Sequence, residues 1–448
     1  MGILSKEFAK FIKNLSIETT PPETVLFAKQ LAMKTLAGMV AGSATPSARP
    51  VISYAKKVGH WSEDAGVYGS KFKCFIEYAI LANGHFAHAA ELEDDCFPSA
   101  TSDVTVVPVV FPMAEHLKIS GKVVVESLLA GFETMNRLGK FPITYRGITE
   151  LPFFGILGAA ASAAKVLDLT EEQIQNALGI SIARAAGYLA NVGTDAHYFE
   201  SSMACRDGYF AAIMAKEGLT GTHDIEGWLK HLHGKELPYE EQLQDLGGRS
   251  RWFTHDFWIK KYPNCFLTHR QIDIVKALQQ KHNIDPEKVE KVEVYVGDVD
   301  YRMCNRPELT DYESARFSFQ HLLASVLVDG DLDFESFTDE MRDRPIVRKL
   351  RKKVDVILRK EDPLGAWMTG IADVRIFMSD GTVYKDTMEQ SVGGSKSPLT
   401  TDQFIDLYRK YTRRFLKEPE IRKSADMIVD LENQKDILPL MSILTFGN

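Results

Sequence analysis

The densest group of side chains able to transfer protons lies in the segment NGHFAHAAELEDDCFPSATSDVTVVP, residues 83–108. A helical conformation would place His85, His88, Glu91 and Asp95 along one stripe, at steps of three, three and four residues. Imidazoles and carboxylates are the usual general acids and bases of enzymes. The pattern predicts an acid/base site, with a solvated helix face or a zinc site as the alternatives.

Composition excludes several classes of partner. The chain has 448 residues, enough for two or three domains, and is 45% hydrophobic and 25% charged. A net charge of −8 argues against nucleic acid or an anionic membrane as a partner, but still allows a small anionic substrate. No stretch resembles a signal peptide or a membrane span. The five cysteines are scattered without a CxxC pair, so we expect a reducing, cytoplasmic compartment.

Periodicity predicts helices throughout the first 240 residues. They include residues 72–96, which carry the proton-transfer groups, and 155–164, whose run GILGAAASAA would let a neighbouring helix approach closely. Thr170 and Gln173 form a capping-box pattern that opens a helix over 171–186. The last 50 residues return to helix, over 400–415 and 418–431.

The segment between these helical parts has a different pattern. Alternating valines predict a strand over 291–296, a second strand follows at 354–358, and an Asp-Gly turn joins strands 372–378 and 382–386. Helices are expected over 268–280 and 319–327. The predicted fold is mainly α with an antiparallel α+β insert: an all-helical domain of residues 1–268 and 395–448, and a smaller α/β domain of residues 269–394.

Six blocks, in order, resemble the MmgE/PrpD family over nearly the whole chain. They are NGHFAHAAELEDD (83–95), VVPVVFPMAEHLKISGKVVVESLLAGFETMNRLGK (106–140), GILGAAASAAKVLDLTEEQIQNALGISIARAAG (155–187), ACRDGYFAAIMAKEGLTG (204–221), KKYPNCFLTHRQID (260–273) and RFSFQHLLASVLVDGDL (316–332). The resemblance implies a helical domain built from both chain ends with an inserted α/β lid. It also implies a homodimer, no metal or organic cofactor, and proton movement beside a carboxylate of a small di- or tricarboxylic acid.

Several family site positions carry other residues here. The family's acidic residue falls on Glu91, and the Thr that follows its acidic block falls on Asp95. Two family histidines fall on Thr101 and Thr149, whose hydroxyls do not titrate near neutral pH. The family's Lys falls on His197.

Other positions lie in the second half of the chain. The family's lid Tyr falls on His321, whereas the Lys-Tyr-Pro-x-Cys segment and its following His are kept, with Lys261, Tyr262 and His269. The changes indicate a site rebuilt for another substrate or reaction.

The resemblance and the residues together predict a lyase, a dehydratase or decarboxylase, that acts on a small polycarboxylate without a metal. In this hypothesis one of Glu91, His197 or His321 transfers the proton alpha to a carboxylate. The remaining predicted residues hold the substrate: Asp95, Thr101, Thr149, Arg206, Lys261, Tyr262 and His269. An isomerase, epimerase or cyclase on the same scaffold, or an inactive paralogue acting as a binding protein, are the alternatives.

Overall fold

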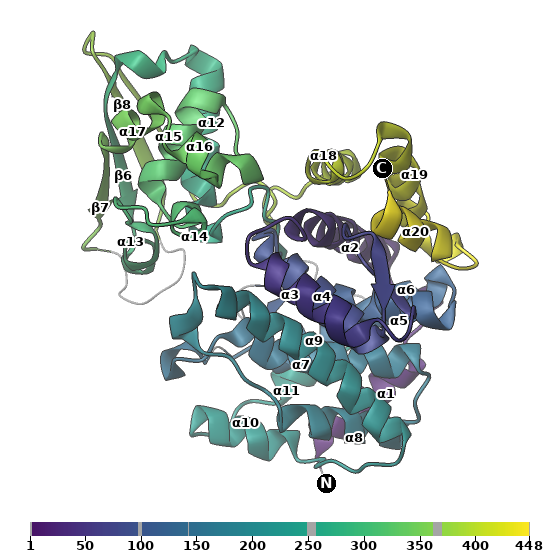
Figure 1. The fold of residues 1–448 in the computed structure, drawn as a ribbon. Helices are drawn as coiled ribbons and strands as arrows, with labels where there is room; N and C mark the ends of the chain where they lie inside the picture. The colour runs from purple at the N-terminus through teal and green to yellow at the C-terminus, as the bar shows by residue number, and fades with distance from the viewer. Residues whose placement is uncertain (1, 97–100, 142, 249–256, 362–369, 448) are drawn as a thin grey trace. The chain divides into compact units, whose positions relative to one another are not determined.

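The chain folds into two compact units (Figure 1). A computed structural model describes residues 2–96, 101–141, 143–248, 257–361 and 370–447. One unit comprises Met1–Trp258 and Thr400–Asn448, and the other comprises Ile259–Leu399. Residues 259–268 and 395–399, which the sequence assigned to the helical domain, therefore belong to the smaller unit.

The larger unit is helical and is built from both ends of the chain, purple to teal and yellow in Figure 1. Its α-helices are α1 (Ile3–Asn14), α2 (Pro22–Gly42), α3 (Ala48–Gly59), α4 (Ile76–Ala89), α5 (Val107–Leu117), α6 (Gly121–Leu138), α7 (Glu150–Val166), α8 (Glu171–Ile182), α9 (Asp195–Lys216), α10 (Ile225–His233), α11 (Glu240–Leu243), α18 (Thr401–Thr412), α19 (Glu418–Val429) and α20 (Leu438–Phe446). Its 3-10 helices are η1 (Ile17–Thr19), η2 (Asp103–Thr105), η3 (Thr144–Arg146), η4 (Leu189–Asn191) and η9 (Leu431–Asn433).

Short strands complete this unit. Strands β1 (Ala65–Val67) and β2 (Phe72–Cys74) pair antiparallel. Strands β4 (Thr101–Ser102), β3 (Asp95–Cys96) and β5 (Phe257–Trp258) form a second antiparallel sheet, in that order.

Helix α9 lies at the centre of the packing that matters for the site. It packs against α4 and α7, and α7 packs in turn against α6. The small residues of α7 allow this approach, as the sequence predicted: a Cβ built at Gly158 would lie 3.0 Å from the carbonyl oxygen of Gly131 on α6. The predicted capping box of α8 is also confirmed, with Thr170 and Gln173 each bonded to the other's backbone N–H, at 3.2 and 3.0 Å.

The helix predicted over residues 72–96 forms, as α4 (Ile76–Ala89), but both predicted ends are wrong. Residues 72–74 form β2, α4 ends at Ala89, and residues 95–96 form β3. The backbone of Glu91 takes a left-handed conformation, with φ 52°, and its N–H closes a turn onto the carbonyl of His88 at 2.8 Å. The chain leaves the helix there, so Glu91 and Asp95 do not continue the stripe of His85 and His88, and the predicted stripe and its zinc alternative do not form.

The smaller unit carries a four-stranded sheet in the order β7-β6-β8-β9, formed by β6 (Val289–Val296), β7 (Val354–Leu358), β8 (Ala372–Met378) and β9 (Val383–Met388). Its helices are η6 (Phe266–Thr268), α12 (His269–His282), η7 (Pro286–Lys288), α13 (Asp298–Cys304), α14 (Tyr312–Arg316), α15 (Phe319–Asp329), η8 (Phe334–Phe337), α16 (Asp339–Arg342) and α17 (Pro345–Arg351). Helices α12 and α15 pack on the sheet.

The sheet is mixed rather than antiparallel throughout. Strands β8 and β9 pair antiparallel around the predicted turn, but β6 and β7 run parallel, with Val292 opposite Val354. The alternation that predicted β6 is confirmed, since Val292, Val294 and Val296 are all buried. No helix in the described part of the chain has the length and apolar character needed to span a membrane.

Candidate active site

Two histidines from different helices meet inside the helical unit. His88 lies in the last turn of α4 and His197 in the first turn of α9, with ring centroids 4.4 Å apart. The Nδ1 atom of His88 lies 2.8 Å from the hydroxyl oxygen of Ser201, one turn beyond His197 on α9. Tyr198 packs its ring against His88 as well, at 5.2 Å between centroids. All four side chains are buried, so the imidazoles lie in a water-poor environment.

A buried acidic segment, residues 91–94, follows α4. Glu91 is 2% exposed, and the carboxylate of Glu93 lies 4.0 Å from Nε2 of His88. The left-handed backbone at Glu91 turns this segment back toward the end of α4. Two predicted acid/base residues, Glu91 and His197, therefore both adjoin His88, one through the turn and the other through ring contact.

Buried charges hold this acidic segment in place. The ammonium of Lys34, on α2, pairs with the carboxylate of Asp94 and bonds the carbonyl of Leu92. The backbone N–H of Asp94 donates to Asp103 at 2.9 Å, and Thr35 donates to the other oxygen of the same carboxylate. The side chains of Lys34 and Asp94 are both 0% exposed, so their pairing is screened little by water. The segment that carries Glu91 is thus tied to α2 and η2.

His85 occupies a different environment, although it lies only one turn before His88. Its Nε2 atom is 3.2 Å from the hydroxyl of Ser47, and its ring packs on Phe86 and Phe199. Burial lowers the pKa of His85 to about 4, so the ring is neutral near pH 7.

Thr149 lies at the N-terminus of α7, beside the loop that precedes α9. Its hydroxyl is buried and has no hydrogen-bond partner among the described residues, and its backbone lies against Gly187. Glu200 holds that loop: its carboxylate accepts the N–H of Tyr188 at 3.0 Å and the amide of Asn191 at 2.6 Å. Burial raises the pKa of Glu200.

The other predicted residues of the helical unit are placed apart from the histidine pair. Arg206 lies nine residues after His197 on α9, about 13 Å along the helix. Its guanidinium binds the neighbouring carboxylate of Asp207, at 2.9 and 2.5 Å. Asp95 is a half-buried strand residue whose backbone pairs with those of Ser102 and Trp258. Thr101 lies in β4 opposite Cys96, and residues 97–100 lie outside the described residues.

Two predicted substrate-binding residues, Lys261 and Tyr262, bind one buried carboxylate in the smaller unit, and a third, His269, packs beside Tyr262. Lys261 binds both oxygens of Asp273, at 2.5 and 2.6 Å, and the hydroxyl of Tyr262 donates to the same group at 2.8 Å. Burial lowers the pKa of Lys261, an effect that Asp273 opposes. The ring of His269 packs against Tyr262 and Phe266, and its Nε2–H donates to the carbonyl of Asn264 at 3.3 Å.

His321 is enclosed by the smaller unit's own side chains. It lies in the first turn of α15, is 0% exposed, and donates from Nε2 to the carbonyl of Ser336 at 2.8 Å. Burial, with help from nearby arginines, lowers the pKa of His321 to about 4. Its donating nitrogen is therefore already in use, and the ring is neutral near pH 7.

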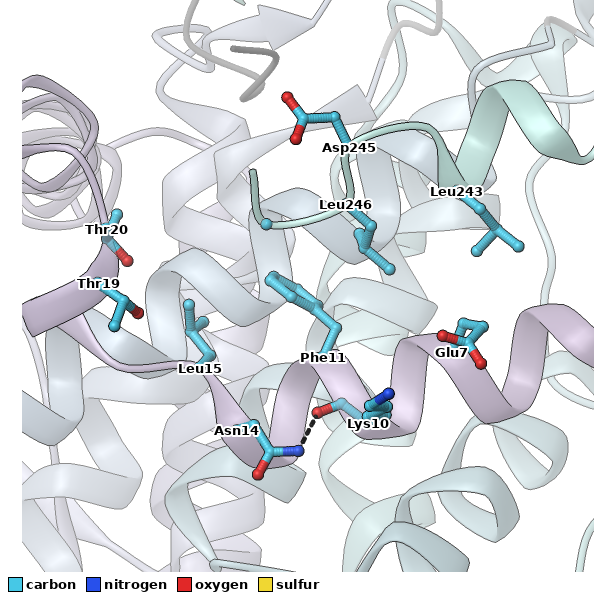
Figure 2. Close-up of a pocket in the computed structure, with 11 residues that line it drawn as sticks. Glu7, Lys10, Phe11, Asn14, Leu15, Thr19, Thr20, Leu243, Asp245 and Leu246 are labelled. Carbon is cyan, nitrogen blue, oxygen red and sulfur yellow. Dashed lines mark hydrogen bonds between the residues drawn. The ribbon is translucent and has the colours of Figure 1, made fainter. Parts of the chain in front are cut away.

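The helical unit also has a cavity of about 540 Å³ between α1 and residues 243–247 (Figure 2). Phe11, Leu15, Leu243 and Leu246 supply its apolar wall, and Glu7, Lys10 and Asp245 supply charge. None of the predicted site residues lines it. Among the described residues, no three His, Cys, Asp or Glu side chains are grouped as metal ligands.

Comparison with known proteins identifies the family. The MmgE/PrpD N-terminal domain matches residues 6–236, and the MmgE/PrpD C-terminal domain matches residues 262–433. The chain belongs to the MmgE/PrpD family. The gap between the two matched ranges includes the boundary between the two units of the structure.

Several relatives within the family are similar along almost their whole length. Cis-aconitate decarboxylase of Mus musculus is 25% identical over 462 residues, covering 98% of this chain and 93% of the relative. Cis-aconitate decarboxylase of Aspergillus terreus is 25% identical over 476 residues, covering 98% and 96%. The protein of the same name from Homo sapiens is 23% identical, covering 98% and 94%.

Within this family framework, the structure adds residues that the sequence reading did not assign to the site. Glu200 and Ser201 lie one turn beyond His197 on α9, and Glu93 reaches toward His88. The four-residue step from His197 to Ser201 was a signal that both lie on one helix face. Nothing in the sequence indicated that this face meets the end of α4.

Proposed function

We propose that this chain is a lyase that removes CO2 or water from a small di- or tricarboxylic acid. The observation that supports this most is the ring contact of His88 with His197, together with the hydrogen bond that joins His88 to Glu91 in the buried acidic segment. Imidazole and carboxylate groups at one buried place are suited to moving a proton on and off carbon. The relatives' names favour decarboxylation of a cis-aconitate-like acid as the first reaction to test.

In this proposal Glu91 and His197 transfer the proton alpha to a substrate carboxylate. Decarboxylation leaves electron density on that carbon, which a protonated His197 or Glu91 quenches; dehydration begins with removal of a proton from it. The electron density formed in either reaction spreads onto a carboxylate as an enediolate-like charge, which hydrogen-bond donors stabilise. We do not assign the proton step to His321, because its donating nitrogen is bonded to Ser336.

The test is a panel of citrate, methylcitrate, cis-aconitate and longer alkylcitrates, followed by proton NMR in D2O. We expect product release from at least one acid, with a deuteron in the product where carbon is protonated. Deuterium exchange without a new product would support the isomerase alternative, and absence of both binding and reaction would support the binding-protein alternative.

Two variants test the assigned residues. We expect His197→Ala and Glu91→Gln each to lower kcat by 100-fold or more, the range in which general acid/base residues contribute. His223→Ala, a partly exposed histidine bonded to Asn176 in the same unit, is the control and should keep full activity. Full activity in His197→Ala would remove that residue from the mechanism.

We also propose that the chain is a homodimer, as its family membership implies. Sedimentation equilibrium should then give twice the mass of a single chain at micromolar concentration. A single-chain mass at that concentration would contradict the proposal.

A further inference from the structure

His88, on α4, contacts both α9 and the acidic segment that follows α4. Its Nδ1 atom meets the hydroxyl of Ser201 on α9 at 2.8 Å, and its ring meets that of His197 at 4.4 Å. Its Nε2 atom faces the carboxylate of Glu93, 4.0 Å away, and its carbonyl accepts the N–H of Glu91 at 2.8 Å. The fully buried His88 therefore contacts both residues to which the proton transfer is assigned: His197 through its ring and Glu91 through its backbone carbonyl.

We propose that His88 is a positioning residue, which holds His197 and the acidic segment at a fixed separation through Ser201 and Glu93. This inference rests on the proposed function, because it presumes that Glu91 and His197 act on one substrate. At metal sites, the partners that orient a ligand typically change affinity or activity 10- to 100-fold when they are removed, and we expect an effect of about that size here. A displacement of about 1 Å in a reacting group is enough for losses of that size.

The competing explanation is that His88 serves only to fill the core. His85 provides the comparison, because it is another fully buried histidine on α4 and also lies beside a serine, Ser47, at 3.2 Å. The two differ in what they face. His85 meets Ser47 and the ring of Phe199, whereas His88 meets His197 and the acidic segment. A purely structural role predicts equal effects from the same substitution at both positions.

The substitutions separate the two sides of the ring. In His88→Asn the amide lies near the place of Nδ1, so the contact with Ser201 is kept and the reach toward Glu93 is lost. In His88→Gln the amide extends toward the place of Nε2, so the reach toward Glu93 is kept and the contact with Ser201 is lost. Ser201→Ala removes the hydroxyl without changing either histidine, and is the milder variant if a substitution at His88 prevents folding. His85→Asn is the matched control.

We expect His88→Asn, His88→Gln and Ser201→Ala to lower kcat 10- to 100-fold on the acid that the wild type converts, with KM changed less than threefold. His85→Asn should lower the melting temperature about as much as His88→Asn but keep kcat within twofold. If His88→Asn keeps kcat within twofold as well, the positioning role is overturned.

A second measurement does not depend on turnover. The ring resonances of His197 can be assigned in nitrogen-15 spectra by their loss in His197→Gln. We expect them to shift in His88→Asn and Ser201→Ala and to stay in place in His85→Asn. If the wild type converts no acid in the panel, the proposed function fails, and these spectra alone decide whether His88 positions His197: unchanged resonances in His88→Asn would overturn it.

Discussion

At the residue scale, the buried pair of Lys34 and Asp94 should be among the most sensitive points of the helical unit. Both side chains are fully buried, so removing one leaves the other charge without its compensation. We expect Lys34→Met to lower the free energy of unfolding by about 3 to 5 kcal/mol, measured by urea denaturation. The exposed pair of Lys13 and Asp168 is the control, and Lys13→Met should change stability by about 1 kcal/mol or less.

The stabilities of Lys34→Met and Lys13→Met also test how the acidic segment of the site is held. If Lys34→Met destabilises no more than Lys13→Met, the acidic segment is not held by this charge pair. The double variant Lys34→Met/Asp94→Leu should recover part of the loss, because it leaves no charge buried alone.

His321 should make stability depend on pH. Its pKa is lowered to about 4 when folded, against about 6.5 for an unfolded chain. Between these values the unfolded chain binds a proton that the folded chain does not, so stability is complete above pH 6.5 and falls as pH drops toward 4. The predicted loss from this group between pH 7 and pH 5 is about 2 kcal/mol.

The measurement compares urea unfolding at both pH values in the wild type and in His321→Gln. The glutamine amide can still donate to Ser336 but does not titrate, so the variant should lose less stability on acidification. His282→Gln, at an exposed histidine, should leave the difference unchanged. An equal loss in wild type and His321→Gln would mean that burial of His321 carries no pH-dependent energy.

Sequence reasoning predicted some of the residues that the structure brings together and missed others. Glu91 and His197 were named from residue type and family position, and both lie next to His88. Periodicity could not foresee the left-handed turn at Glu91, which depends on how the acidic segment is bound by Lys34 and Asp103. The carboxylate of Asp273 was missed for the same reason: its partners Lys261 and Val392 are far apart in sequence, and only the fold brings them together.

At the scale of elements, the seam between α7 and α9 should control how accurately His197 is placed. A Cβ at Gly208 would overlap the Cβ of Ala159 and lie 2.8 Å from the carbonyl oxygen of Ile156. We expect Gly208→Ala to force the two helices apart, to lower stability by about 1 to 3 kcal/mol and to reduce kcat. Thermal unfolding and the activity assay measure the two effects.

Gly38, in the interior of α2, is the matched control. A Cβ there meets Ala90 at 3.6 Å, which is an ordinary contact. Because alanine is the better helix former, Gly38→Ala should stabilise the chain by about 0.5 to 1 kcal/mol. Equal effects of the two substitutions would show that the α7–α9 seam is not tightly packed.

Elements with local signals were the ones predicted well. The capping box at Thr170 and the turn between β8 and β9 depend only on residues that are neighbours in the sequence, and both form where expected. The parallel pairing of β6 with β7 was not foreseen, because the register joins residues about 60 positions apart. A strand's own alternation reports which face is buried, but not the direction of its neighbour.

At the scale of the whole molecule, the boundary of the smaller unit follows from contacts across its own ends. The change from helices in the first 240 residues to a strand at 291–296 was visible in the sequence, yet the boundary was placed at 268, where a helix was expected to start. The structure includes residues 259–268 because Lys261 and Tyr262 bind Asp273. The N–H of Ile259 also bonds the carbonyl of Gly393, at 3.2 Å, which brings the two ends of the unit together.

This closure predicts that residues 259–399 fold as a separate chain. The segment has a sheet covered by α12 and α15, and its two ends meet, as is usual for an inserted domain. We expect the isolated segment to show cooperative urea unfolding by circular dichroism. Asp273→Asn should then lower its stability by about 2 to 4 kcal/mol, because Lys261 is largely buried and would lose its countercharge. Asp355→Asn, in an exposed pair with Lys291, should change it by less than about 1 kcal/mol. A segment that stays unfolded would contradict its independent folding, and equal tolerance of both substitutions would show that Asp273 does not close its ends.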